Sequence, residues 1–336
     1  MLNARHIQEY QTVCRNALID SDASLVSSSL ASTCVPFDHI VTYDEVDSTN
    51  LRVKDALNRP DYDGWPCVHT ALVQTHGYGR QGRSWTSPLG GLYASLGIDL
   101  AQFIPTPLRT DVSTLSLVAG LSVKAALEQE SDCAAQDIQI KWPNDVLVND
   151  AKICGISLEL FNSTMLCMGV GINVVRDERA YENTPSETKY QYAYACDGVQ
   201  TTGLELKVEY RTRMEALLGC FLAQFGVCLA LWIEQGFTPF VKQFNDCLAW
   251  KGKYVGIERV DGTRLDSGVI TAVTERGTLL LANPDESPDE NSDKNPDKNP
   301  DEENSGQNLS QNNACLYRAN FQEVASGEVH FLPPGN

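Results

Sequence analysis

The sequence of 336 residues lacks several patterns that would assign it to a class of protein at once. It contains no C-x-x-C pair, no H-E-x-x-H motif and no His/Cys cluster with zinc-ligand spacing, which argues against a zinc site. No apolar run reaches the ~18 residues that are expected of a membrane span. The N-terminus also lacks the cationic and then apolar pattern of a secretion signal. These absences predict a cytoplasmic protein without a membrane anchor.

Positive charge is scarce as well. The chain has 26 Lys and Arg against 44 Asp and Glu, which gives a formal net charge of −18. Because such a protein is repelled by nucleic-acid phosphates and anionic membranes, we expect neither as a partner. Eleven cysteines are scattered without a recognisable motif. Their distribution predicts reduced, mostly buried thiols.

The length predicts about two domains at ~150 residues each. Residues 1–38 form an N-terminal extension, with a short amphipathic helix and a polar linker, that is too short for a winged helix-turn-helix domain. Residues 39–248 combine strand and helix patterns and predict an α+β fold, a mixed sheet packed on helices. Residues 249–336 have short strands with turn residues between them, typical of a small β-barrel. An acidic Pro/Asp/Asn tract over residues 283–313 interrupts the barrel, and we expect it to be disordered.

The most informative segment is GYGRQGRSW, residues 77–85, which follows a predicted strand ending in Gln74. Three glycines in six residues let the backbone turn tightly and approach a ligand closely. Arg80 and Arg83 add permanent cations beside exposed backbone N–H groups, which suits a phosphate or a mixed acyl phosphate. Taken alone, such a loop is more often a surface turn with solvated arginines. Two further segments favour a site.

The second segment is KWPND, residues 141–145, with Lys152 seven residues beyond Asp145. A hairpin between them, indicated by Asn149-Asp150, would return Lys152 to the level of Lys141 and Asp145. Two lysines and a carboxylate beside the arginine loop would form a site for a polyphosphate and a divalent ion. Taken separately, Lys141 and Asp145 are each as typical of a solvated charge or a turn cap as of a binding site. For Lys152 alone, a solvated charge is the more common case.

The third segment is GVGIN, residues 169–173. Its glycines admit a flat ligand against the strand, and the Asn173 amide could contact a base or a phosphate. Without its neighbours, this segment is an ordinary Gly-containing strand.

Together with the DSTN motif at residues 47–50, these segments resemble the biotin protein ligase family, whose enzymes attach biotin to carrier domains of carboxylases. The resemblance covers about residues 38–282 and 315–332, with the motifs in matching order and spacing. It implies a catalytic core like that of class II aminoacyl-tRNA synthetases, with biotin and ATP sites in residues 39–248, followed by an SH3-like barrel. It also implies a short form without an N-terminal DNA-binding domain.

The resemblance implies a role for each matching position. The matching catalytic residues are Lys152, Arg80 and Asp145. The matching biotin-binding residues are Ser48, Thr49, Asn50, Gln74, Tyr78, Gly79, Arg80, Lys152 and Gly155. The matching ATP- or phosphate-binding residues are Gly77, Gly82, Arg83, Trp85, Lys141, Asn144 and Asn173. No fixed metal site in the protein is implied, and Mg²⁺ is expected to enter with ATP.

The implied reaction activates biotin with ATP as biotinyl-5′-AMP and then transfers biotin to a lysine of a biotin carboxyl carrier protein, as in acetyl-CoA carboxylase. Tyr78 departs from the family, which usually has arginine at this position. Three alternatives stay open: a lipoate or octanoate protein ligase or transferase, a biotin-responsive DNA-binding repressor, and a binding protein that keeps the pocket without the chemistry.

Overall fold

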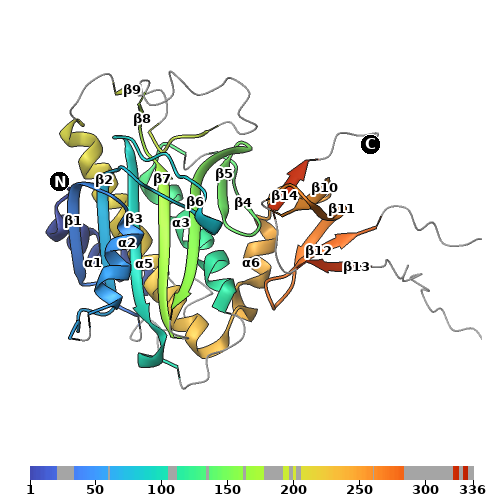
Figure 1. Ribbon diagram of the computed structural model, residues 1–336, viewed down its shortest axis with the longest axis horizontal. Helices are drawn as coiled ribbons and strands as arrows, with labels where there is room; N and C mark the ends of the chain where they lie inside the picture. The colour runs from blue at the N-terminus through green and yellow to red at the C-terminus, as the bar shows by residue number, and fades with distance from the viewer. Residues whose placement is uncertain are drawn as a thin grey trace, which may run out of the picture.

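A computed structural model of the chain has a large mixed sheet with helices on both faces and a smaller antiparallel sheet toward the C-terminus (Figure 1). It describes residues 1–20, 34–59, 61–104, 112–133, 136–161, 164–177, 192–196, 200–201, 206–259, 261–283, 321–324 and 328–331. The predicted tract over 283–313 lies outside these residues except for Asn283.

The large sheet has seven strands in the order β1-β2-β3-β7-β6-β5-β4. Their bounds are β1 His39–Val46, β2 Cys67–Gln74, β3 Gly91–Asp99, β4 Ile138–Lys141, β5 Asp145–Val148, β6 Ala151–Phe161 and β7 Met165–Asn173. Strands β1 and β2 pair in parallel across the helix α2 (Thr49–Leu57), and every other pairing in this sheet is antiparallel. The mixed α+β fold predicted from the sequence is thereby confirmed.

Helix α2 lies in front of the sheet in Figure 1, whereas α3 (Leu115–Glu130) and α5 (Val208–Gln235) lie behind it. Small elements complete this part: η2 Arg80–Gly82, η3 Leu100–Gln102, η4 Val112–Thr114, β8 Arg176–Asp177, β9 Gln200–Thr201, η5 Thr238–Phe240 and α6 Val241–Asp246. Because both faces are covered, β2 and β3 are buried along nearly their whole length. The sheet therefore provides a rigid platform for side chains on its front face.

Helix α5 corrects one sequence prediction. By length and composition alone it is apolar enough to cross a membrane, with a mean hydropathy of 2.1 over an 18-residue window. The statement that no apolar run reaches membrane length is therefore wrong. Within the protein, 78% of that window is buried, because α5 packs against both α1 (Ala4–Asp20) and α3. A helix that is apolar on all sides and enclosed in this way belongs to the core of a globular fold.

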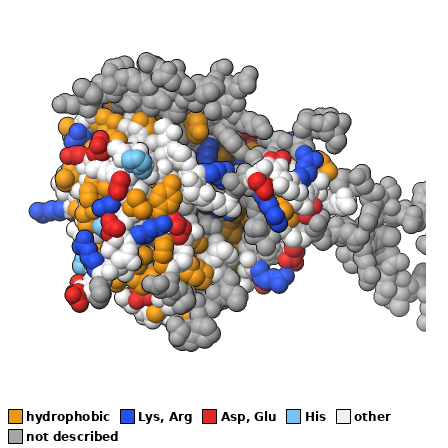
Figure 2. Space-filling view, in the orientation of Figure 1, with side chains coloured by type: hydrophobic (Ala, Val, Ile, Leu, Met, Phe, Trp, Pro, Cys, Tyr) orange, Lys and Arg blue, Asp and Glu red, His pale blue; other side chains and the backbone are white. Residues whose placement is uncertain are grey.

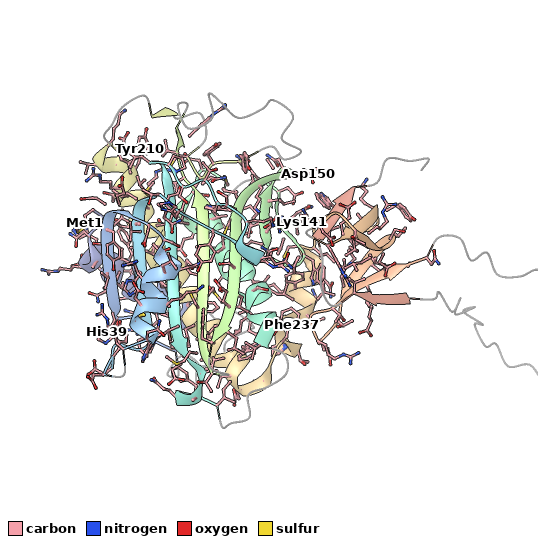
Figure 3. The ribbon with its side chains drawn as sticks, in the orientation of Figure 1. Met1, His39, Lys141, Asp150, Tyr210 and Phe237 are labelled. Carbon is pink, nitrogen blue, oxygen red and sulfur yellow. A yellow bond between two sulfur atoms is a disulfide. The ribbon has the colours of Figure 1, made fainter. Side chains whose placement is uncertain are left out.

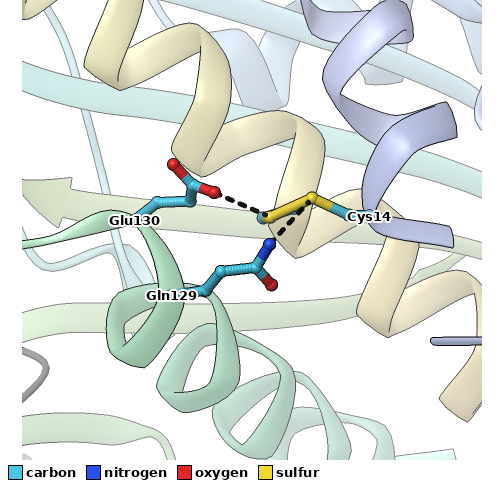
Figure 4. The surroundings of a disulfide bond; sticks show 4 residues. Cys14, Gln129 and Glu130 are labelled. Atoms are coloured by element: carbon cyan, nitrogen blue, oxygen red, sulfur yellow. Dashed lines mark hydrogen bonds between the residues drawn. A yellow bond between two sulfur atoms is a disulfide. The ribbon is translucent and has the colours of Figure 1, made fainter. Parts of the chain in front are cut away.

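The N-terminal helix α1 is part of this core. The Asn3 backbone N–H donates to Glu215 of α5 at 2.7 Å, and His6 Nδ1 lies 3.0 Å from the other oxygen of that carboxylate. Cys14 of α1 forms a disulfide with Cys220 of α5 beside Gln129 and Glu130 of α3 (Figure 4). The prediction of reduced thiols is wrong for this pair. The other described cysteines are free, and most of them are buried, as predicted.

The C-terminal part has a five-stranded antiparallel sheet in the order β13-β12-β11-β10-β14. Its strands are β10 Tyr254–Glu258, β11 Arg264–Val273, β12 Leu279–Ala282, β13 Phe321–Val324 and β14 Glu328–Phe331. The predicted all-β character is confirmed, whereas closure into an SH3-like barrel stays a prediction. Trp142 Nε1 donates to the Gly277 carbonyl at 2.9 Å and so joins this sheet to the segment that follows β4.

Candidate active site

The floor of the candidate site is a row of residues that runs across the front face of the large sheet. Register pairs Tyr93 with Gly171, Gly171 with Gly155, Gly155 with Asp145, and Asp145 with Lys141. The middle of this row has no side chains, so the indole of Trp85 lies directly on it. A Cβ on either Gly155 or Gly171 would lie 2.8 Å from the Trp85 ring. The glycines therefore provide the flat surface that the sequence predicts, and it carries an aromatic ring.

One end of the cavity is neutral and polar. Ser95 Oγ lies 2.7 Å from both Thr49 Oγ1 and Asn50 Oδ1, and Asn50 Nδ2 donates to Ser157 Oγ at 3.4 Å. Gln74 Oε1 accepts from the Thr49 backbone N–H at 2.8 Å. These contacts fix the first turn of α2 against β2, β3 and β6. They hold hydroxyl and amide groups without a formal charge at this end of a cavity of about 250 Å³.

The other end is cationic. Four of the side chains that line the cavity are positively charged, namely Arg80, Arg83, Lys141 and Lys152, and among the lining residues that the structure describes Asp145 is the one carboxylate. Lys152 Nζ lies 2.8 Å from Asp145 Oδ1, and Arg80 donates to Asn144 Oδ1 at 2.9 Å. Figure 2 shows Lys and Arg side chains on the large domain where it faces the C-terminal sheet, and Figure 3 places Lys141 at this junction. The surplus of positive charge suits a polyanion.

Burial shapes the charges of this end. It lowers the pKa of the Arg80 guanidinium, while the nearby Asp145 carboxylate opposes that shift. It also lowers the pKa of Lys141 from 10.5 to about 8; Asp145 raises that pKa, and the cations Lys152 and Arg83 lower it further. The Lys141 ammonium lies 5.0 Å from the centre of the Trp250 ring, at the start of the C-terminal part. An anion bound here would relieve the repulsion between these cations.

The cavity has one indole that faces it without a hydrogen-bond partner. Trp85 Nε1 is buried and has no partner among the described residues. The Lys152 ammonium lies 5.0 Å from the centre of the same ring. Trp85 therefore lies between the neutral end and the cationic end, and its face and its N–H are both positioned to contact a ligand that spans them.

The structure brings together most of the residues that the sequence predicts for the site. Those that line the cavity are Thr49, Asn50, Gln74, Tyr78, Gly79, Arg80, Arg83, Trp85, Lys141, Asn144, Asp145, Lys152 and Gly155. Lys152 and Arg80, which the prediction requires to converge, line the same cavity, where Lys152 pairs with Asp145.

Four predicted residues do not line the cavity. Ser48 is buried, and its hydroxyl has no partner among the described residues. Gly77 shapes the loop by accepting the Trp85 backbone N–H at 2.9 Å, and Gly82 has a positive φ of 72° that the turn requires. Asn173 donates to the Lys152 backbone carbonyl at 3.3 Å and so supports the start of β6, and its contact with a nucleotide stays a prediction.

Several lining residues were missed by the sequence prediction. Ser95 and Ser157 belong to the row of small side chains on β3, β7 and β6, where Ser95 pairs with Gly169 and Gly169 with Ser157. Gly155 and Ser157 are small residues two positions apart on β6, and this spacing could have indicated that Ser157 lines the cavity. Tyr192 and Val329 come from distant segments, and nothing in the sequence indicated them.

Comparisons with known proteins agree with this geometry. Residues 43–173 match the model of the biotin/lipoate A/B protein ligase family, which defines the class of protein. This segment of the chain is therefore similar to that family, and two relatives and one solved structure extend the similarity over more of the chain.

The chain is 28% identical over 243 residues to the bifunctional ligase/repressor BirA of Escherichia coli (strain K12), an alignment that covers 70% of this chain and 67% of that protein. It is 29% identical over 248 residues to biotin–[acetyl-CoA-carboxylase] ligase of Paracoccus denitrificans, covering 71% and 92%. The solved biotin protein ligase from Aquifex aeolicus in complex with biotin and ATP superimposes with a TM-score of 0.59 at 25% identity, covering 88% of this chain and 98% of that one. The family resemblance is thus confirmed.

Proposed function

We propose that this protein is a biotin–[biotin carboxyl carrier protein] ligase, which forms biotinyl-5′-AMP from biotin and ATP and then transfers the biotinyl group to a carrier lysine. The observation that carries the proposal is the cavity itself. A neutral polar end at Thr49, Asn50 and Ser95 and a cationic end at Lys152 and Arg80 meet on one glycine floor. Names and ligands of the relatives support the same assignment.

The neutral end suits the ureido ring of biotin. That ring is polar but uncharged, and each of its groups left buried without a partner would cost about 1–3 kcal/mol. The hydroxyls of Thr49 and Ser95 and the amide of Asn50 provide donors and acceptors there. An aliphatic octanoyl chain or a dithiolane ring would offer these groups no further hydrogen bond. This difference favours biotin over lipoate or octanoate as the substrate.

The cationic end suits the activation step. The biotin carboxylate attacks the α-phosphorus of ATP, a bond to phosphorus forms, and the bond to the β-phosphate oxygen breaks to release pyrophosphate. Both reactants are anionic, so Lys152, Arg80 and Arg83 would screen their repulsion and stabilise the charge that develops on the phosphate oxygens. Lys152 is held for this task by Asp145 at 2.8 Å.

We expect Mg²⁺ to enter the site bound to ATP. Magnesium commonly binds one or two protein carboxylates together with substrate phosphates. Asp145 is the one described carboxylate that lines the cavity, and Lys152 already contacts it, so the residues fit an ion brought in by the phosphates better than a permanent site. Asp145 would hold that ion, which would supply further charge neutralisation.

In the transfer step the amine of the carrier lysine attacks the acyl carbon of biotinyl-5′-AMP, an amide bond forms, and AMP leaves. The step needs no enzyme nucleophile, so the protein contributes alignment of the two reactants. The described cysteines nearest the floor, Cys154 and Cys167, are buried, and burial raises the pKa of both thiols. They are therefore unsuited to nucleophilic attack.

The direct test is mass spectrometry of an isolated biotin carboxyl carrier domain after incubation with the protein, MgATP and one acid. We expect a gain of one biotinyl group with biotin and no gain with lipoate or octanoate. A gain with lipoate or octanoate alone would reassign the substrate. Binding of biotin without any modification of the carrier would leave a binding protein that lacks the chemistry.

The lowered pKa of Lys141 predicts a pH dependence. Below pH 8 its ammonium attracts the phosphates of ATP, and above pH 8 the ligand-free protein loses that charge. The dissociation constant of MgATP should therefore rise between about pH 7.5 and 9. Each ~1.4 kcal/mol of attraction between the ammonium and the phosphates that is lost raises this constant about tenfold. Isothermal titration calorimetry measures it. Lys141→Arg keeps its charge and should give a flat profile; an equal slope in both proteins would contradict the assignment to Lys141.

A further inference from the structure

Lys54 joins three elements of the site from behind the cavity. It lies one helical turn beyond Asn50 on α2, and its Nζ lies 2.9 Å from Glu159 Oε2 on β6, two residues beyond Ser157. The Lys54–Glu159 ion pair therefore runs beside the Asn50–Ser157 hydrogen bond at the neutral end. Lys54 does not itself line the cavity.

The same ammonium contacts the arginine-bearing loop. It lies 5.0 Å from the centre of the Tyr78 ring and 5.0 Å from that of Phe161 at the end of β6. Tyr78 does line the cavity, and its backbone forms a bridge with Ser84 that closes the two arms of the loop. One cation thus connects α2, β6 and the loop. Burial would lower the pKa of Lys54, but contacts with Tyr78 and Glu159 raise it overall, so the charge is retained.

This contact gives a physical reason for tyrosine at position 78. A guanidinium there would place a second cation beside the Lys54 ammonium, and like charges at such a distance repel one another. A neutral aromatic face attracts the ammonium instead. Burial raises the pKa of Tyr78, so its phenol stays neutral at physiological pH. A neutral tyrosine is therefore a better neighbour for the Lys54 ammonium than an arginine would be.

We propose that Lys54 is a positioning residue that holds the loop of residues 77–85 closed over the ligand through the face of Tyr78. The inference rests on the proposed function only for the identity of the ligand. The closed loop slows escape of biotin and of its reactive adenylate, and it keeps water away from the acyl phosphate bond.

The first test needs no ligand. Arg80 is half-buried and bonded to Asn144, so cleavage after Arg80 by trypsin requires the loop to open, and its initial rate, followed by mass spectrometry, reports the open population. We expect about tenfold faster cleavage in Lys54→Met and in Tyr78→Leu, and a wild-type rate in Tyr78→Phe, which keeps the aromatic face. The double variant Lys54→Met/Tyr78→Leu should be no faster than either single one, because both remove the same contact.

Controls separate positioning from general destabilisation. Lys242→Met removes an exposed lysine that pairs with Asp246 on α6 far from the cavity, and it should leave loop cleavage unchanged. Lys54→Arg keeps the cation and should restore the slow rate. If Lys54→Met instead accelerated cleavage throughout the chain and Lys54→Arg did not rescue it, the role of Lys54 would be structural and the proposal wrong.

Charge matching gives the second test. Tyr78→Arg should open the loop about as far as Lys54→Met does, and Tyr78→Arg/Lys54→Met should close it again, because the introduced guanidinium would then face Glu159 without a competing cation. Biotin dissociation, followed by the fluorescence of Trp85, should change in parallel. Absence of biotin binding in the wild type would overturn the proposed substrate. Unchanged loop cleavage in Lys54→Met would overturn the present inference alone.

Discussion

Lys152→Ala is expected to lower the rate of biotin-dependent pyrophosphate exchange by roughly 100- to 1000-fold, which is the usual effect of removing one preorganised group that stabilises transition-state charge. Lys152 is mostly buried between Asp145 at 2.8 Å and the face of Trp85 at 5.0 Å, so its ammonium is fixed before substrates arrive. Binding of ATP alone should fall much less, because Arg80, Arg83 and Lys141 remain. The loss should therefore appear mainly in kcat.

The fold should survive this change. The Asp145 carboxylate keeps Arg80 as a nearby cation when Lys152 is removed, so no buried charge is left without compensation. Unfolding curves followed by circular dichroism should coincide within error. Lys242→Ala, on the surface of α6, is the matched control and should retain full activity. Exchange at the wild-type rate in Lys152→Ala would show that another group performs the activation.

Gly171→Ala is expected to lower kcat/KM for biotin by about 100-fold, since a displacement near 1 Å in a reacting site can have that effect. The new Cβ would lie 2.8 Å from Trp85 Nε1 and 2.9 Å from Cε2, which is closer than van der Waals contact allows. The indole must therefore lift off the floor and push into the space between the neutral and the cationic end. Steady-state kinetics with biotin and ATP varied in turn would measure the loss.

A second strand glycine separates this effect from simple strain. A Cβ on Gly268 of β11 would lie 2.9 Å from the Ala282 carbonyl oxygen, which is comparable crowding at a distance from the cavity. Gly268→Ala should therefore destabilise the protein to a similar extent while the enzyme that remains folded keeps its activity. Equal losses of activity in the two variants would mean that the floor has no special role.

Local patterns predicted the large sheet well because its strands are bounded by clear turn signals. Strands β5 and β6 fold as the predicted hairpin around Asn149-Asp150, which returns Lys152 to Asp145. The convergence of this hairpin with the arginine loop was a hypothesis from the charges, and the family resemblance gave each residue its role. Charge alone left each of these residues equally typical of a solvated surface.

What the sequence could not predict depends on contacts between distant segments. The disulfide joins Cys14 to Cys220 across 206 residues, and no motif connects them. Ser48 matches a biotin-binding position of the family, yet its side chain is buried and does not line the cavity. The contact of Lys54 with Tyr78 depends on how α2 crosses β6, which neither periodicity nor composition specifies.

The order of elements along the chain has a consequence for biosynthesis. By its length and composition, an isolated helix α5 would be apolar enough to partition into lipid. The two helices that enclose it, α1 and α3, both precede it in the sequence, and chains fold from the N-terminus as they are made. Both helices that enclose α5 are therefore already synthesised when α5 leaves the ribosome. Helices α1 and α3 can thus cover α5 as it is made and protect it from the membrane insertion and aggregation that its composition favours.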